Sequence, residues 1–147
     1  MSDDKLSLSE FLPYRLSVLS NRISRSIADE YEDQFRLSQS EWRVMAILGE
    51  EPNLSAGQVA ERTAMDKVAV SRAVNRLLEH GRIERHFADD DRRRSVLALS
   101  KPGQKTYSEI TPIALDYEAR LLGHFSQDEK TQLDDLLRKL DLSQVKT

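Results

Sequence analysis

Side chains able to bind a polyanion are concentrated in the middle of the chain. Residues 66–81 are typical of an amphipathic helix that ends at a glycine, because Val70, Val74 and Leu77 recur at helical spacing and should face a core. The opposite face combines cations, which bind phosphate, with serine and asparagine, which can read the edges of bases. On this face we expect contacts to double-stranded DNA from Lys67, Val68, Ala69, Ser71, Arg72, Asn75 and Arg76.

Two short strands should follow this helix. Residues 82–87 and 95–99 have the character of strands, and a charged tip, 89–94, lies between them. A strand, a charged turn and a second strand directly behind a basic helix form the order of a winged helix-turn-helix. We therefore expect further DNA contacts from the residues at this tip, namely Asp91, Arg92, Arg93 and Arg94.

The charge of the chain is unevenly distributed. Its net charge is −3, which is unusual for a DNA-binding protein. Between residues 62 and 94, however, nine lysines and arginines outnumber six acidic residues, so this segment carries +3 and the remainder −6. Such asymmetry directs one positive face towards a polyanion, although a charged surface that is merely solvated is the alternative.

Length and composition narrow the class of protein. The chain has 147 residues, which suit one domain or one domain with dimerisation helices, and it has no cysteine. No apolar run approaches the roughly 20 residues that span a membrane, and the first residues do not resemble a secretory signal. We therefore expect a cytoplasmic protein without disulfides, membrane partners or cofactors.

Caps and apolar spacing predict the remaining helices. A long helix should cover residues 12–35, and serine capping boxes at 38–41, 55–58 and 126–129 should each begin another. A helix from about residue 101 to 125 should bend at Pro112. The predicted fold class is mainly α with a small β-wing, that is, a winged helix-turn-helix with N- and C-terminal dimerisation helices.

The terminal helices lack partners within so small a domain. We treat residues 1–147 as one domain, with a DNA-binding core at 38–100 and dimerisation helices at 11–37 and 101–147. Two copies would bury the apolar stripes of these helices and would present paired recognition helices to a palindrome. A monomer with a helical cap is the alternative.

The order of these elements resembles the multiple-antibiotic-resistance regulator (MarR) family over nearly the whole chain. The segment 91–100 is similar to the family's wing signature, in which Asp91 and Arg93 match the aspartate and arginine, and 70–85 is similar to its recognition-helix pattern. The resemblance implies a homodimeric transcriptional regulator, usually a repressor, whose Arg93 reaches the minor groove while Asp91 braces the wing. It also implies release from DNA by a small aromatic or phenolic ligand.

Other functional groups give weaker signals. In the family the first two helices flank a cleft, so a small aromatic ligand could contact Tyr14, Arg15, Trp42 and Arg43, although Trp42 could equally be a core residue and the arginines surface residues. The three histidines, His80, His86 and His124, are scattered, so we expect no metal site. We also expect no catalytic residues, and hence no enzyme.

The sequence therefore predicts a sequence-specific transcriptional regulator, most simply a homodimeric repressor that a small ligand releases from a palindromic operator. Two alternatives stay open. One is a DNA-binding regulator without an effector, and the other is a helical protein-interaction module.

Overall fold

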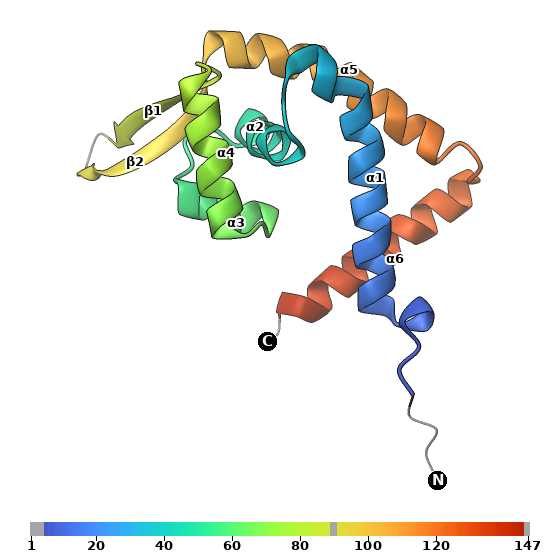
Figure 1. Ribbon diagram of the computed structural model, residues 1–147. Coiled ribbons are helices and arrows are strands. Elements are labelled where there is room, and N and C mark those ends of the chain that lie inside the picture. The colour runs from blue at the N-terminus through green and yellow to red at the C-terminus, as the bar shows by residue number, and fades with distance from the viewer. Residues whose placement is uncertain (1–4, 89–90, 146–147) are drawn as a thin grey trace. The chain divides into compact units, whose positions relative to one another are not determined.

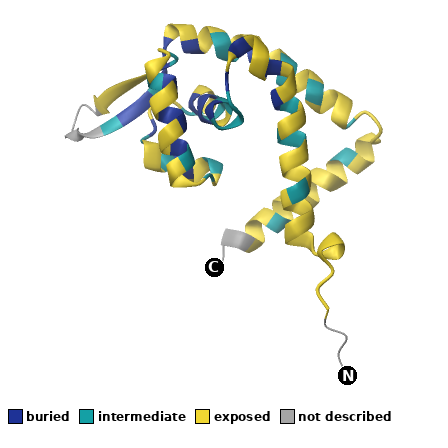
Figure 2. Ribbon diagram, in the orientation of Figure 1, coloured by how far each residue is buried: buried dark blue, intermediate teal, exposed yellow. Residues whose placement is uncertain are grey.

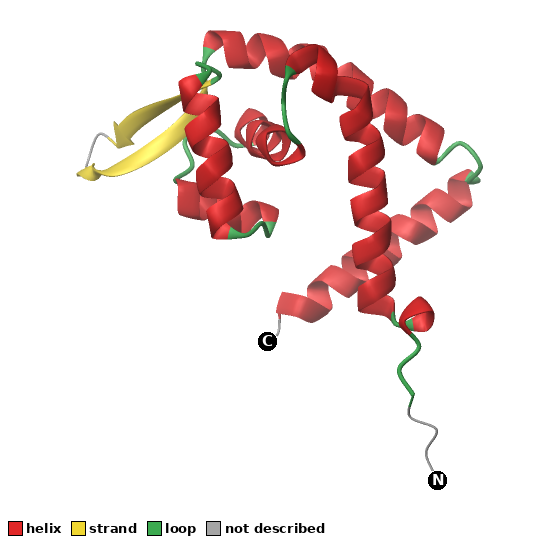
Figure 3. Ribbon diagram, viewed as in Figure 1, coloured by secondary structure: helices red, strands yellow, loops and turns green. Residues whose placement is uncertain are grey.

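The structure is a computed structural model that describes residues 5–88 and 91–145. Its described part is mainly helical and contains one two-stranded antiparallel sheet, which confirms the predicted fold class (Figures 1 and 3). In chain order the elements are η1 (Leu8–Glu10), α1 (Leu12–Phe35), α2 (Gln39–Glu50), α3 (Ala56–Thr63), α4 (Lys67–Glu79), β1 (Ile83–Ala88), β2 (Asp91–Leu99), α5 (Lys101–Leu121) and α6 (Gln127–Val145).

Three helices begin at the predicted capping boxes. In each box the serine hydroxyl accepts from a main-chain N–H of the first turn, and a Glu or Gln side chain accepts from the main-chain N–H of the serine. The serine-to-N3 distances are 3.2 Å at Ser38, 3.1 Å at Ser55 and 3.1 Å at Ser126. Four-residue sequence signals therefore fix where α2, α3 and α6 start.

The chain divides into two compact units, residues 1–113 and 114–147, and α5 contributes to both. The core of the first unit joins the second half of α1 to the helix-turn-helix and to the base of the sheet. The sequence prediction grouped residues 11–37 with the dimerisation helices, but α1 supplies core residues too. Its side chains at the most buried positions are Ala28, Tyr31 and Phe35.

Trp42 is part of this packing. Its ring lies 5.8 Å from that of Tyr31 and 5.8 Å from that of Tyr107, and the latter pair is stacked. Tyr107 lies so close to Gly49 that a Cβ atom there would be 2.6 Å from the tyrosine ring. The aromatic trio thus links α1, α2 and the first half of α5.

The second unit exposes much of its apolar surface. Leucines recur on α6, but none is buried, and Figure 2 shows this helix almost entirely as exposed. The preceding helix ends at Leu121, four residues earlier than predicted, because Gly123 and the turn before Ser126 interrupt it. The helix continues through Pro112, and the predicted bend there stays a prediction.

Candidate nucleic-acid interface

Helix α4 has one buried face and one exposed polar face. The side chain of Asp66 caps the helix by accepting from the N–H of Ala69 at 3.1 Å. Val70, Val74 and Leu77 are almost fully buried, as predicted. Consequently the outward face consists of exposed Lys67, Val68, Ser71, Arg72, Asn75 and Arg76, with Ala69 half-buried (Figure 2).

The end of α4 turns the chain directly into the wing. Gly81 has φ of +71°, a conformation that glycine adopts readily and other residues avoid. The N–H groups of Gly81 and Arg82 donate to the carbonyls of Leu78 and Leu77, which closes the last turn. The glycine stop that the sequence predicts therefore sets the angle between α4 and β1.

Helix α3 and the loop before it support α4. Val59 is completely buried, and Ala64 forms the turn between the helices with φ of 55°. Arg62 donates two hydrogen bonds, of 3.1 and 3.2 Å, to the carboxylate of Glu51. Helices α3 and α4 form a helix-turn-helix, in which the second helix presents its polar face to solvent.

Arg76 is not free on this face. Its Nε atom lies 3.6 Å from Oε1 of Glu41, which is on α2. The Arg76 side chain is 66% exposed, whereas that of Glu41 is 3% exposed. The sequence predicts Glu41 only as a capping residue, and no local pattern could have revealed a partner 35 positions away.

Arg82 is one of the nine cations counted between residues 62 and 94, but its guanidinium points into the fold and adds little to the positive surface. Its Nη2 atom donates to the main-chain carbonyl oxygen of Phe35 at 2.5 Å, and Nη1 is buried without a hydrogen-bond partner among the described residues. The carbonyl of Phe35 is at the C-terminal end of α1, where helix carbonyls are unpaired and the helix dipole favours a cation. This arginine therefore stabilises the fold.

The wing is longer in strand and shorter in turn than predicted. Strand β1 pairs with β2 from Ile83↔Leu99 to Ala88↔Asp91, with an irregularity between Phe87 and Ala88. Residues 91–94, which the sequence analysis assigned to a turn, belong to strand β2, whose main chain pairs with β1 at Asp91 and again at Ser95. The side chains of Asp91, Arg92, Arg93 and Arg94 lie outside the described residues, so their DNA contacts stay predictions.

Two other wing side chains, Phe87 and His86, are exposed to solvent. Phe87 is 61% exposed although it is aromatic. His86 lies 3.2 Å from the carboxylate of Glu84 on the same strand. His80 stands at the C-terminal cap of α4.

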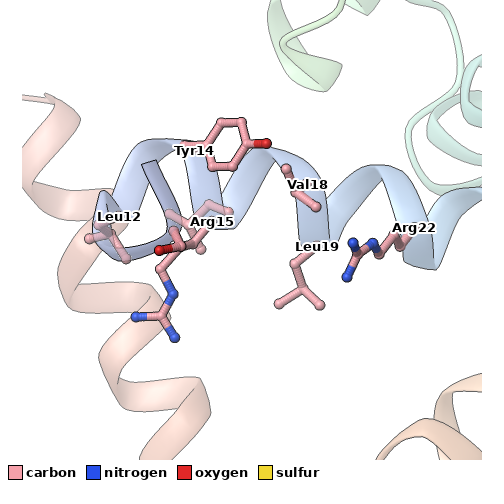
Figure 4. A pocket seen from close by; sticks show the side chains of 8 residues that line it. Leu12, Tyr14, Arg15, Val18, Leu19 and Arg22 are labelled. Atoms are coloured by element: carbon pink, nitrogen blue, oxygen red, sulfur yellow. The ribbon is translucent and has the colours of Figure 1, made fainter. Parts of the chain in front are cut away.

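The four candidate ligand residues fall into two separate hollows of the first unit. Tyr14 and Arg15 line a shallow hollow of about 480 Å³, formed by α1 and η1 residues such as Leu12, Leu19 and Arg22. Figure 4 shows the ring of Tyr14 and the guanidinium of Arg15 pointing to different sides of α1. One chain alone therefore does not enclose a ligand between them.

Trp42 and Arg43 line the second hollow, of about 280 Å³, with Ile47 and Glu50 of α2 and Thr63 of α3. The Arg43 guanidinium also donates to the hydroxyl of Ser24 on α1 at 2.6 Å. Trp42 is thus both a packing residue and a wall of this hollow. No group of His, Asp and Glu in the described residues has the arrangement of a metal site.

The chain is similar in sequence to known transcriptional regulators. A family profile described as the MarR family matches residues 37–94, which cover α2, α3, α4 and most of the wing. The HTH-type transcriptional regulator BilQ of Clostridium symbiosum is 31% identical over 93 residues, which are 63% of this chain and 65% of that protein. The chain therefore spans just under two thirds of the length of this relative.

Solved structures of MarR-family regulators are similar to this chain over nearly its whole length. A MarR/EmrR family regulator from Acinetobacter sp. ADP1 is 27% identical and superimposes with a TM-score of 0.88, over 97% of this chain and all of that one. Bordetella bronchiseptica BpsR, whose DNA binding is described as regulated by 6-hydroxynicotinic acid, shares the fold at 22% identity, with a TM-score of 0.80 and coverage of 93% and 97%.

The chain is thus similar in sequence and in fold to DNA-binding transcriptional regulators of the MarR family. Both the family and the winged helix-turn-helix were predicted from the sequence. The described helices include none long and apolar enough to cross a membrane.

Proposed function

We propose that this chain is a homodimeric repressor that binds a palindromic operator through α4 and the wing. The observation that carries the proposal is the division of α4 into a buried apolar face and an exposed face of cations, Ser71 and Asn75. A helix of this kind fits the major groove, where arginine and asparagine discriminate bases by paired hydrogen bonds. The wing residues 91–94 would contact the adjacent minor groove and phosphates.

Exposed apolar side chains support the homodimer. In the first unit, Leu12, Leu16 and Leu19 are each more than a third exposed, and in the second unit the same holds for Leu133, Leu136 and Leu137. Clusters of large exposed apolar residues on both terminal segments indicate surfaces that a second copy would cover. A dimer acting on DNA would work in the cytoplasm.

Release by a small aromatic ligand is the regulatory part of the proposal. The two hollows supply aromatic rings and guanidinium groups, which suit an aromatic carboxylate. The regulation of BpsR by 6-hydroxynicotinic acid supports this ligand class for the same fold. The ligand would bind more tightly to a dimer conformation that does not fit DNA than to the DNA-binding one. Only such a difference in affinity shifts the equilibrium between the two conformations.

The test is a binding titration with the chain's own upstream DNA and with random DNA, each at two salt concentrations. Arg72→Ala should weaken operator binding about tenfold or more and random DNA much less, since a base contact contributes roughly 1–3 kcal/mol. Arg25→Ala, which removes an exposed arginine of α1, is the matched control and should change both affinities less than twofold. Equal weakening of both DNAs by Arg72→Ala would contradict the proposal.

The same titration tests release. Adding 6-hydroxynicotinic acid or a hydroxybenzoic acid should weaken operator binding in the wild-type chain. Unchanged binding with every such acid would instead favour a regulator without an effector of this class. A chain that binds neither DNA would favour the protein-interaction module.

A further inference from the structure

A buried carboxylate lies directly behind the exposed face of α4. Glu41 is 2% exposed, and its Oε2 atom has no hydrogen-bond partner among the described residues. Its other oxygen, Oε1, accepts from the N–H of Ser38 at a long 3.4 Å. A buried carboxylate with so few partners is destabilising unless a positive charge compensates it.

The capping role does not explain this carboxylate. The box at Ser55 uses Gln58 in the same position, where the amide oxygen accepts from the serine N–H at 2.9 Å. The box at Ser126 uses Glu129, but that side chain is exposed. A neutral glutamine caps α3 with a shorter bond than Glu41 forms at α2, so the capping box does not require a buried negative charge at position 41.

Arg76 is the partner that the structure provides. Its Nε atom is 3.6 Å from Oε1 of Glu41, while two thirds of its side chain remains exposed beside Arg72 and Asn75. Because the Glu41 carboxylate is buried, water and salt screen its attraction to Arg76 less than they screen a pair in open solvent. The inner side of the guanidinium is thus held towards α2, and the outer side faces solvent.

We propose that Glu41 is a positioning residue that makes Arg76 specific for the operator. The proposal rests on the proposed function, namely DNA binding by the exposed face of α4. A free arginine can follow any phosphate, whereas a held arginine has already lost much of its rotamer freedom. The carboxylate also offsets part of the positive charge of Arg76. Arg76 therefore contributes less binding free energy at the phosphates of random DNA, and more at the one base edge that its fixed orientation can reach.

The substitution Glu41→Gln tests this directly, because glutamine should keep the capping box and remove the charge. We expect the ratio of the affinity for operator DNA to the affinity for random DNA to fall approximately tenfold, as it would on the loss of one base contact. The affinity for random DNA should stay the same or rise. The slope of log affinity against log salt concentration should steepen by up to about one unit. Glu129→Gln, the same change in an exposed box, is the matched control and should leave both affinities unchanged.

A double-mutant cycle with Arg76→Ala completes the test. In the Arg76→Ala background, Glu41→Gln should no longer alter the affinity ratio, and it should recover part of the melting temperature that Arg76→Ala removes. An unchanged ratio in the single Glu41→Gln variant, or the same fall with and without Arg76, would overturn the inference. Arg72→Ala distinguishes failure of this inference from failure of the proposed function. Normal operator binding by that variant would contradict DNA recognition by α4 itself.

Discussion

The guanidinium of Arg82 donates a hydrogen bond to the main-chain carbonyl of Phe35, and so joins the turn between α4 and β1 to the last residue of α1. These two residues are 47 positions apart in the chain. The same segment is held from the other side, since the carbonyl of Arg82 accepts from the N–H of Ser100 at 3.1 Å. The base of the wing is thereby tied to both α1 and the start of α5.

Arg82→Ala should lower the free energy of unfolding by about 2 kcal/mol, the typical contribution of a hydrogen bond to a charged group. Chemical denaturation at one fixed protein concentration measures this, because the stability of a dimer depends on concentration. Arg85→Ala removes an exposed arginine from strand β1, directly after Arg82, and should stay within about 0.5 kcal/mol of wild type. Equal stabilities of the two variants would exclude a structural role for Arg82.

Gly103→Ala should be strongly destabilising. A Cβ atom at this position would lie 1.8 Å from the carbonyl oxygen of Arg82, so the start of α5 or the base of the wing would have to move. We expect a loss of about 3 kcal/mol, at the upper end of the range for overpacked sites. Gly57→Ala is the control, since its Cβ would meet only the Ser55 hydroxyl, at 3.9 Å, and should be neutral or slightly stabilising in a thermal melt.

Tyr31 should make the protein less stable at high pH. Burial, helped by the neighbouring Glu32 carboxylate, raises the pKa of Tyr31 from 10.0 to about 12, while Arg43 acts in the opposite direction. The unfolded chain therefore loses this proton first, and stability that is complete below pH 10 should fall by about 2–3 kcal/mol up to pH 12. Denaturation between these pH values checks this, and Tyr31→Phe should show a shallower decline. An equal decline in both proteins would mean that other groups cause it.

Changing Leu133 and Leu137 to Asp should produce monomers, because both side chains are large, apolar and more than a third exposed on α6. Sedimentation velocity should show the change, and operator affinity should fall with it. Thr131→Asp combined with Gln132→Asp adds the same charge at exposed polar positions of α6 and should remain dimeric. If the leucine variant also stays dimeric, this stripe is not the interface.

Arg93→Ala should be the most damaging single change in the wing, and Asp91→Ala the second. The family resemblance assigns Arg93 to the minor groove, whose narrow A·T-rich stretches attract arginine. Arg93→Ala should therefore weaken binding mainly to operators with A·T-rich flanks, whereas Arg92→Ala and Arg94→Ala should weaken all DNAs mildly. Titrations against operators with A·T-rich and G·C-rich flanks compare them. Equal, sequence-independent losses at all three arginines would reduce the wing to a phosphate clamp.

Features that depend on neighbouring residues were predictable from the sequence. The start of α2 at Ser38, the cap at Asp66 and the stop at Gly81 each follow from a few adjacent residues, and the structure confirms all three. The apolar spacing in α4 also predicts which face is buried, and therefore which side chains are available to DNA.

Features that depend on distant residues were not predictable. The inward direction of Arg82 is decided by a carbonyl at the end of α1, and the pairing of Arg76 by a carboxylate on α2. Charge counting treats both arginines as equal parts of a positive surface. The start of β2 at Asp91 is likewise set by backbone pairing with β1, which the charged side chains obscure in the sequence.

Residue Leu54, in the loop between α2 and α3, pairs with Leu97 of β2 as an isolated bridge. The N–H of Leu97 donates to the carbonyl of Leu54 at 2.7 Å, and the carbonyl of Leu97 accepts from the N–H of Asn53 at 3.0 Å. The amide proton of Leu97 can therefore exchange with solvent when β2 and the α2–α3 loop separate locally, or when the whole fold opens. Where this local opening dominates, the exchange rate measures the free energy that holds the wing against the loop before α3, independently of any DNA.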